Sequence, residues 1–465
     1  MLLRSFLTNS GGILFSRILG FFRDILTAST VGANIYSDIF FVAFKLPNLF
    51  RRIFAEGAFT QAFLPAFIHA RHKGRFAISV LLRFLIFLFV LSILVIFTAP
   101  LVTKLMAFGF DDATIALAAP LVRLNFWYLI LIYIVTFMAA LLHYRGHFAT
   151  TAFSTGLLNI SMIVALLLAD SSSPEQSVWF LSIGVIVGGV LQALVHLWAI
   201  KHWRLGRLLK YGLTHWRDKS SEIPKFYRNF SHAVLGSSTA QLSAFLDTWL
   251  ASFLAFGSIS YLYYANRIFQ LPLALFAIAL SVALFPSIAK SLNRKDEKEA
   301  DRLLGRGFWV LCFLLSLSSV GGILLAPEII KLLFERGAFS ANDSLQTSNV
   351  LQMYLIGLTP FGLARLFSLW LYAKQKQAKA ALISGWSLGT NIVLSLLLIS
   401  PLGAAGLALA SSLSGILLFI LTIRAYGVSR FLAIIRPSIL VTLLGVLILE
   451  VILIWGLKEM IDVYF

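Results

Sequence analysis

The sequence predicts an all-α membrane protein that crosses the bilayer many times, and three observations carry this prediction. Of its 465 residues, 59% are hydrophobic and only 12% are charged, whereas a soluble protein of this size has about 25% charged residues. Apolar runs of about 20 residues recur along the whole chain, and each is long enough to cross the hydrocarbon layer. The loops between them are mostly short, and every second loop is basic.

The net charge and the cysteine content exclude two other classes of protein. In a soluble protein a formal charge of +18 would suggest a nucleic-acid partner. Here the positive charges fall in short loops, where they indicate membrane topology and contact with anionic lipids. The single cysteine, Cys312, permits no disulfide within the chain, so a disulfide-stabilised scaffold is excluded.

Thirteen apolar segments qualify as membrane spans. The alternation of basic and non-basic loops is what the positive-inside rule requires for one consistent topology. It places the N-terminus in the cytoplasm, and an odd number of spans then places the C-terminus outside. The predicted spans are 10–30, 38–68, 77–107, 115–143, 150–170, 176–201, 229–256, 260–290, 304–326, 346–373, 378–400, 402–425 and 436–458.

The second span carries more charge than a lipid-facing helix tolerates, because each charge at the bilayer centre costs about 2.5–3.5 kcal/mol. One interpretation is that some of these charges lie at the headgroups or pair with one another. Arg52 and Glu56, for example, are one helical turn apart and could form an ion pair. The interpretation we favour is a helix that lines a water-filled cavity and receives an anion. The charged residues are Asp38, Lys45, Arg51, Arg52 and Glu56.

A basic segment over 203–219 separates the sixth and seventh spans. It mixes Trp, Leu and Tyr with Arg and Lys in the order WRLGRLLKYGLTHWRDK. This composition suggests a helix that lies in the membrane interface on anionic lipid. A solvated basic loop is an equally good interpretation.

The two halves of the chain share a pattern of prolines. The tripeptides KLP and QLP match, ending at Pro47 and Pro272. So do FLP and LFP, ending at Pro65 and Pro286. Halves of six spans each would have the same orientation, which is a parallel repeat with a binding site between the halves; a chance match of apolar helices is the alternative. The repeat predicts an N-terminal lobe over 1–201, a linker over 202–228, a C-terminal lobe over 229–426 and one extra transmembrane helix over 427–465.

Intramembrane charges are the only chemical signal in the chain, since no Gly-rich phosphate loop, HExxH or Cys-x-x-Cys motif occurs. Arginine outnumbers the acids among them. Arginine keeps its charge and grips phosphate with two parallel hydrogen bonds, so several arginines in a cavity suit a phosphate-bearing ligand. The alternative is that each arginine pairs with an acid or a carbonyl for structure. These residues are Arg17, Arg23, Asp24, Asp38, Arg51, Arg52 and Glu56 in the first half, and Asp247, Arg267 and Arg365 in the second.

A resemblance to a known family rests on the same charged segments. The run SRILGFFRD over 16–24, followed by SDIFFVAFKLPNLFRRIFAEGAF over 37–59, is similar to the MurJ (MviN) family of lipid II flippases. The segments LNISM over 158–162 and SISYLYYANRIFQLP over 258–272 agree with it. The resemblance extends over the first twelve spans. It implies the fold of the MOP exporter superfamily, with two six-helix lobes in a V around a central cavity and alternating access.

The resemblance also implies a substrate, which is undecaprenyl diphosphate carrying the peptidoglycan disaccharide-pentapeptide. Two features depart from the family. Some members have acids where this chain has Asn266 and Gln270, which argues against a proton relay there. Members commonly have fourteen spans, so with thirteen the groove proposed for the lipid tail is half missing or the tail is held differently. The family's functional positions fall on Arg17, Arg23, Asp38, Arg51, Arg52, Glu56 and Arg267, with Asp24, Asn266, Gln270 and Arg365 as secondary candidates.

A candidate cation site is centred on Asp247. No basic residue lies within two helical turns along the chain, so this carboxyl group should be protonated or hold a cation. Asn391, Ser395 and Ser411 offer neutral oxygens on the eleventh and twelfth spans, and such donors suit a small alkali cation. Some family members resemble this arrangement with a sodium site between the same helices. A protonated Asp247 bonded to Asn391 is the alternative to sodium.

The apolar spans and the basic loops predict a multi-pass membrane protein, and the resemblance implies that it lies in the bacterial inner membrane, flips lipid II and is not an enzyme. The expected partners are lipid II and anionic membrane lipids, with cell-wall synthesis machinery as an open further partner and no nucleic acid. One alternative is a related exporter of another polyprenyl-linked saccharide or of a drug. Another is a membrane phosphatase acting on polyprenyl diphosphate, which would need a nucleophile or metal-binding acids near the arginines.

Overall fold

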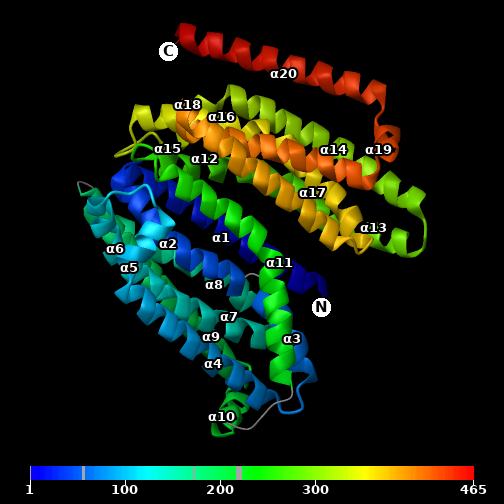
Figure 1. Ribbon diagram of the computed structural model, residues 1–465. Helices are drawn as coiled ribbons and strands as arrows, with labels where there is room; N and C mark the ends of the chain where they lie inside the picture. Colours follow the sequence, from blue (N-terminus) through cyan, green and yellow to red (C-terminus); the bar gives the residue numbers. More distant parts are fainter. Residues whose placement is uncertain (1, 55–57, 171–172, 216–221, 465) are drawn as a thin grey trace. The chain divides into compact units, whose positions relative to one another are not determined.

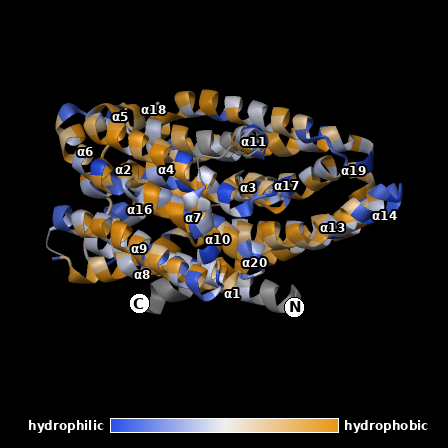
Figure 2. Ribbon diagram, turned by 90° about the horizontal axis from the view of Figure 1, so that it is seen from below, coloured by the Kyte–Doolittle hydropathy of each residue, from blue (hydrophilic) through white to orange (hydrophobic). Residues whose placement is uncertain are grey.

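A computed structural model describes the chain except for residues 1, 55–57, 171–172, 216–221 and 465. The described residues form helices and connecting turns without any strand, which confirms the all-α prediction. Nine helical stretches among them are long and apolar enough to cross a membrane. Hydrophobic residues predominate along such helices as α13, and hydrophilic residues gather in the first turns of α14 (Figure 2). The fold is that of a polytopic membrane protein, and the count of thirteen spans stays a prediction.

The helices pack into two compact units. The first comprises Met1–Gly257 with Arg336–Phe339, and the second comprises Ser258–Glu335 and Ser340–Phe465. This boundary lies one helix later than the predicted start of the C-terminal lobe at 229. The predicted lobes rest on a repeat in the sequence, which packing does not test, so their bounds and their arrangement as a V stay predictions.

In the first unit, α1 packs on α8 and α8 packs on α9, while α2 packs on α6. The third and fourth predicted spans are each built from two helices, and a separate short helix, α10, follows the sixth span (Figure 1). The helices are α1 (Leu2–Val31), α2 (Ile35–Phe54), α3 (Ala58–His69), α4 (Lys73–Phe97), α5 (Ala99–Met106), α6 (Asp112–Phe126), α7 (Tyr128–Tyr144), α8 (Ala149–Leu168), α9 (Pro174–His202), α10 (Gly206–Thr214) and α11 (Glu222–Ala251).

An aromatic cluster explains why α11 belongs to the first unit. Phe226 of α11 is completely buried. Its ring lies 5.9 Å from that of Phe59 and 6.3 Å from that of Phe63, both in α3. It also lies 5.9 Å from the ring of Phe84 in α4. Each buried aromatic side chain removes a large apolar area from its surroundings and packs edge to face against its neighbours, so α11 is held firmly against α3 and α4.

In the second unit, α14 packs on both α17 and the long final helix α20, and α16 packs on α12 (Figure 1). A six-residue π-helix follows Pro272, where the ring of proline removes a backbone donor and disturbs regular α-helical bonding. The elements are α12 (Ser258–Pro272), η1 (Leu273–Ile278), α13 (Ala279–Asn293), α14 (Glu297–Leu324), α15 (Ala326–Phe334), α16 (Ala341–Ile356), α17 (Leu358–Ala373), α18 (Gln377–Tyr426), α19 (Val428–Ile434) and α20 (Pro437–Tyr464).

The predicted parallel repeat has a structural counterpart in the third and ninth spans. The helix α4 ends at Phe97, and α5 begins after a single intervening residue, Thr98, with Pro100 in its first turn. The helix α14 ends at Leu324 and α15 begins in the same way, with Pro327 in its first turn. The next helix is then capped by an oxygen side chain in both units, from Asp111 for α6 and from Ser340 for α16. The recurrence of these features six spans apart supports the repeat.

The turns that follow the fourth and tenth spans match as well. The backbone N–H of His147 donates to Leu142 O at 2.9 Å, and that of Lys376 donates to Leu371 O at 2.8 Å. Each turn has one residue with a left-handed backbone, Gly146 in the first unit and Gln375 in the second. This is the hydrogen-bond pattern of a Schellman cap, repeated at equivalent places of the two halves.

The helix α18 contains two of the predicted spans, which fold back on each other. Gly403 has φ 55° and ψ −132°, which is not helical and is accessible to glycine at little cost. The halves run antiparallel, since Ser387 Oγ donates to the carbonyl oxygen of Ser414 at 2.9 Å. A Cβ atom on Gly406 would lie 2.2 Å from the carbonyl oxygen of Leu398. The tight turn therefore requires glycine at both 403 and 406.

We predict that Gly406→Ala lowers the thermal stability of the purified protein, because the new methyl group meets backbone that cannot move without opening the turn. Overpacking of this kind costs about 1–3 kcal/mol. The matched control is Gly389→Ala in the same helix, where an added Cβ meets nothing within 4 Å and alanine favours the helix by about 0.5–1 kcal/mol. Equal melting temperatures for the two variants in detergent would contradict the tight turn.

Candidate functional site

Arg23 of α1 is buried among polar partners from its own helix and from α8. Its guanidinium forms an ion pair with Asp24, with 2.5 Å between Nη2 and Oδ1. Nη1 donates to the amide oxygen of Asn159 at 3.2 Å and lies 3.6 Å from the sulfur of Met162. The segment LNISM therefore supplies partners for Arg23. These contacts hold α1 against α8, so the structural role that the sequence left open applies to this arginine.

The other predicted residues of the first unit differ in their surroundings. Arg17 is exposed, and its side chain has no hydrogen bond or ion pair with any described residue. Asp38 lies buried in the first turn of α2, and its Oδ2 accepts a hydrogen bond from the backbone N–H of Gly257 at 2.7 Å. The half-buried Arg51 donates from Nε to Oδ1 of Asn48 at 2.9 Å. Among the predicted substrate-binding arginines of this unit that the structure describes, Arg17 is thus the one whose guanidinium is exposed.

The side chains of Arg52 and Glu56 lie outside the residues that the structure describes. Their predicted pairing one helical turn apart therefore stays a prediction. The same holds for the predicted convergence of Arg17, Arg23, Arg52 and Arg267 on one space, because Arg267 belongs to the second unit.

Lys45 lies beside Asp247 in the structure, and the sequence did not predict this proximity. Lys45 of α2 donates from Nζ to Oγ1 of Thr248 at 2.8 Å, and its ammonium interacts electrostatically with the Asp247 carboxylate. Oδ1 of Asp247 is buried and accepts no hydrogen bond from a described residue. No base lies near Asp247 along its own helix, but α2 brings one next to it in space. The Lys45 ammonium is therefore a third candidate to neutralise this carboxylate, besides a proton and a cation.

In the second unit, the predicted residues of α12 are paired within their own helix. Nη2 of Arg267 donates to the hydroxyl of Tyr263 at 2.8 Å, and the guanidinium lies 5.0 Å from the centre of that ring. Gln270 donates from Nε2 to Oδ1 of Asn266. Arg365 of α17 is exposed. Tyr263 therefore orients the guanidinium group of Arg267. This contact was not predicted from the segment SISYLYYANRIFQLP.

The three neutral oxygen donors proposed for a cation lie on the two halves of α18. Asn391 donates from Nδ2 to Oγ of Ser411 at 3.1 Å, which leaves the amide oxygen of Asn391 as the atom that would face a cation. Ser395 is completely buried, and its Oγ has no hydrogen-bond partner among the described residues. A buried hydroxyl without a partner costs free energy, which makes it a reasonable ligand. Asp247 belongs to the other unit, so the complete set stays a prediction.

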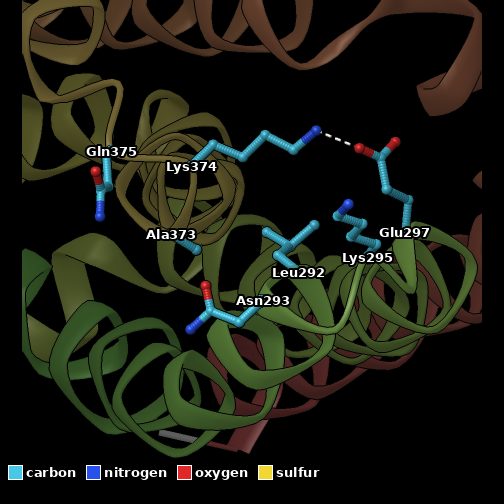
Figure 3. Close-up of a pocket in the computed structure, with 7 residues that line it drawn as sticks. All are labelled: Leu292, Asn293, Lys295, Glu297, Ala373, Lys374 and Gln375. Atoms are coloured by element: carbon cyan, nitrogen blue, oxygen red, sulfur yellow. Dashed lines mark hydrogen bonds and ion pairs between the residues drawn. The ribbon is translucent and has the colours of Figure 1, made fainter.

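A cavity of about 470 Å³ lies in the second unit, between the end of α13 and the turn from α17 to α18 (Figure 3). Glu297 at the start of α14 forms ion pairs with both Lys374 and Arg430, and Figure 3 shows the Lys374 ammonium directed at this carboxylate. The ring of Trp370 lies 4.7 Å from the Lys374 ammonium and 5.6 Å from the Arg430 guanidinium. These charges are satisfied by one another, so this cavity ties helix ends together and contains none of the predicted substrate-binding residues.

The charged residues of the site were predicted from the sequence, but the residues that form hydrogen bonds with them were not. Asn159 pairs with Arg23, Thr248 with Lys45, and Tyr263 with Arg267. An amide or hydroxyl residue inside an apolar helix is a signal that could have identified Asn159 and Thr248 as partners. The charge of Arg23 is balanced by Asp24, so the exposed Arg17 is the described cation of the predicted set in this unit that suits an anionic ligand.

Comparisons with known proteins show which family and which fold this chain resembles. The family described as "Lipid II flippase MurJ" matches residues 27–465. A Helicobacter pylori protein named "Probable lipid II flippase MurJ" is 51% identical over 423 residues, which cover 88% of this chain and 92% of that protein. A solved structure titled "Lipid II flippase MurJ, inward closed conformation" aligns with a TM-score of 0.80 and 26% identity over 98% of each chain. An inward-facing multidrug resistance MATE family transporter of the MOP superfamily has a TM-score of 0.72 at 13% identity, covering 90% of this chain and 95% of its own, and so shares the fold.

Proposed function

The chain belongs to the lipid II flippase MurJ family, and we propose that it moves lipid II from the cytoplasmic to the outer leaflet of the bacterial inner membrane. The observation that carries this proposal is the 51% identity with the Helicobacter pylori protein over most of both chains. The match of the family over 27–465 supports it. The family consists of transporters rather than enzymes, so no covalent bond of the substrate changes. A contact with cell-wall synthesis machinery stays a prediction.

We propose that the diphosphate of lipid II is gripped by Arg17, Arg23, Arg52 and Arg267. Guanidinium groups bind phosphate through two parallel hydrogen bonds and keep their charge at every working pH. Arg17 is exposed and has no partner among the described residues, which suits a direct contact. Arg23 is engaged with Asp24 and Asn159, so it either exchanges these partners for phosphate or positions α1. Sugars and peptide then occupy the polar volume while the lipid tail stays in the bilayer.

Complementation tests the function directly. A strain depleted of its own lipid II flippase should grow when it produces this protein, and should lyse when it carries an empty vector. Release of inorganic phosphate from polyprenyl diphosphate by the purified protein would instead support the phosphatase. Failure to complement, with the protein present in the membrane, would favour an exporter of another polyprenyl-linked saccharide or of a drug.

We predict that alanine at Arg17, Arg23, Arg52 or Arg267 cripples complementation while the protein still accumulates in the membrane. Lysine at each position should rescue only in part, because an ammonium lacks the bidentate fork. The control is Arg294→Ala, which removes an exposed arginine near the start of α14 and should leave growth unchanged. Normal growth of both Arg52→Ala and Arg267→Ala in the depletion strain would refute the diphosphate grip.

We further propose that a sodium ion drives the cycle by binding to oxygens of Asp247, Asn391, Ser395 and Ser411. The unpartnered Oγ of Ser395 and the buried Oδ1 of Asp247 support this set, since carboxylate, amide and hydroxyl oxygens are hard ligands. Two alternatives remain open, a protonated Asp247 and its neutralisation by Lys45. The three alternatives differ in their response to sodium.

We predict that sodium raises the melting temperature of the purified protein more than potassium or choline does at equal ionic strength. The sodium-specific rise should vanish in Asp247→Asn and persist in the control Asp112→Asn, which alters an exposed acid in the first turn of α6. Identical curves in the three salts would remove the sodium site and leave protonation or Lys45 as the partner of Asp247.

The basic loops lead us to propose a cytoplasmic N-terminus and an outside C-terminus. We predict that a reporter active only in the cytoplasm is inactive when fused after Phe465 and active when fused after Lys219, in the basic linker. High activity of the fusion after Phe465 would contradict the orientation and reveal a miscounted span.

A further inference from the structure

A second cavity of about 280 Å³ lies in the first unit, where α9 ends and α10 begins. Its wall combines three cationic side chains with two apolar ones and no carboxylate. Because it is built within one unit, its geometry does not depend on the placement of the other. The lining residues are Leu197, Ile200, Lys201, Arg204, Gly206 and Arg207.

The three cations of this cavity have no partner among the residues that the structure describes. Lys201, Arg204 and Arg207 are exposed, and none of their side chains forms a hydrogen bond or an ion pair with a described residue. The contrast with the cavity of the second unit is direct, because there Glu297 pairs with Lys374 and Arg430. Three like charges around one cavity repel one another, and an anion in the cavity would relieve that repulsion.

The cavity is supported by a firmly docked α10. A Cβ atom on Gly74 of α4 would lie 2.4 Å from the carbonyl oxygen of Leu208, and one on Gly212 would lie 2.2 Å from that of Gly74. The two backbones therefore touch, and Figure 1 shows α10 beside the start of α4. Nη2 of Arg75 also donates to the hydroxyl of Tyr211 at 3.2 Å. Such close packing fixes the start of α10, and with it Arg207, next to the end of α9.

The turn from α9 to α10 holds an arginine in an unusual backbone conformation. Arg204 has φ 54°, in the left-handed region where a non-glycine residue costs roughly 1–2 kcal/mol. The turn is closed by a hydrogen bond from Leu205 N to Ile200 O at 3.0 Å. Glycine fills the corresponding position of the turn after α7, at Gly146. The turn at Arg204 therefore carries a guanidinium where the backbone alone would favour glycine.

The surroundings of the cavity point to lipid rather than to a soluble anion. Leu197 is 53% exposed and Trp198 is 66% exposed on the outside of the last turns of α9. Trp203 follows at the helix end and is 38% exposed. Tryptophans at the end of a membrane-spanning helix lie at the level of the lipid headgroups. The apolar floor thus continues onto the lipid-facing side of α9, and the cations lie at headgroup depth.

We propose that this cavity binds an anionic phospholipid, with the phosphodiester on Lys201, Arg204 and Arg207 and the acyl chains along Leu197. Guanidinium groups match phosphate oxygens in geometry as well as in charge. The bound lipid holds α10 and the linker at the cytoplasmic membrane surface. The site is separate from the diphosphate grip and does not depend on the transported substrate.

The test is a binding titration of the purified protein in a nonionic detergent with short-chain phosphatidylglycerol. Phosphatidylcholine of the same chain length and inorganic phosphate are the other ligands. Wild-type protein should bind phosphatidylglycerol and bind the other two much more weakly. The triple variant Lys201→Gln, Arg204→Gln, Arg207→Gln should bind phosphatidylglycerol about a hundredfold more weakly, because each basic residue near an anionic surface contributes severalfold to affinity.

A matched triple variant in the second unit removes the same number of positive charges. Arg294→Gln, Lys298→Gln and Lys379→Gln change exposed cations and should leave the affinity for phosphatidylglycerol unchanged. If the first triple variant does not fold, Arg204→Gln and Arg207→Gln are measured singly, with about a fivefold loss expected for each.

Three results would overturn the proposal. The first is wild-type affinity in the Lys201, Arg204 and Arg207 variants. The second is an equal loss in the matched triple variant, which would reduce the effect to net charge. The third is binding of inorganic phosphate as tightly as phosphatidylglycerol, which would identify a soluble anion as the ligand.

Discussion

A charge in the low-dielectric interior of a membrane must have a partner or face water, and the polar architecture of this chain depends on that constraint. Arg23 illustrates it, because its guanidinium is surrounded by Asp24, Asn159 and Met162. Lys45 illustrates it again, bonded to Thr248 and beside Asp247. Such contacts cross between helices, so they fix which helices pack together. In each case an intramembrane charge connects two helices of the first unit.

Glycine and aromatic residues determine the packing that these polar contacts complete. Gly406 lets the two halves of α18 approach until backbone meets backbone, and the Gly74–Gly212 pair does the same for α4 and α10. The ring of Phe226 packs against Phe59 of α3 and Phe84 of α4 and so holds α11 against both helices. Without a hydrophobic force between helices in lipid, close approach and well-packed side chains supply much of the association. Each unit can thus move as a rigid body. A transporter whose binding cavity opens first to one side of the membrane and then to the other requires such rigidity.

The fold was predictable from the sequence because hydropathy is a local signal. Each apolar run predicts a helix without information from any other part of the chain. The prolines at 47 and 272 indicated the repeat, and Pro100 and Pro327 at the starts of α5 and α15 support it. Only part of the candidate site was predictable from the sequence, namely the charged residues and not the residues that contact them. A charge in an apolar run is visible in the sequence, but its partner comes from packing. The lysine beside Asp247 is the clearest case, since it lies about 200 positions away in α2. The spans broken at Thr98 and Trp127 were likewise read as continuous, because mid-helix breaks leave little trace in hydropathy.

Leaflet exchange of lipid II in proteoliposomes tests the central claim most directly. Purified protein is reconstituted with a fluorescent lipid II, and a quencher that cannot cross the bilayer reports the fraction of label in the outer leaflet over time. The account predicts that label initially shielded in the inner leaflet becomes quenchable much faster than in protein-free liposomes, with lipid II recovered chemically intact. Exchange no faster than in protein-free liposomes, from protein shown to be folded, would contradict it.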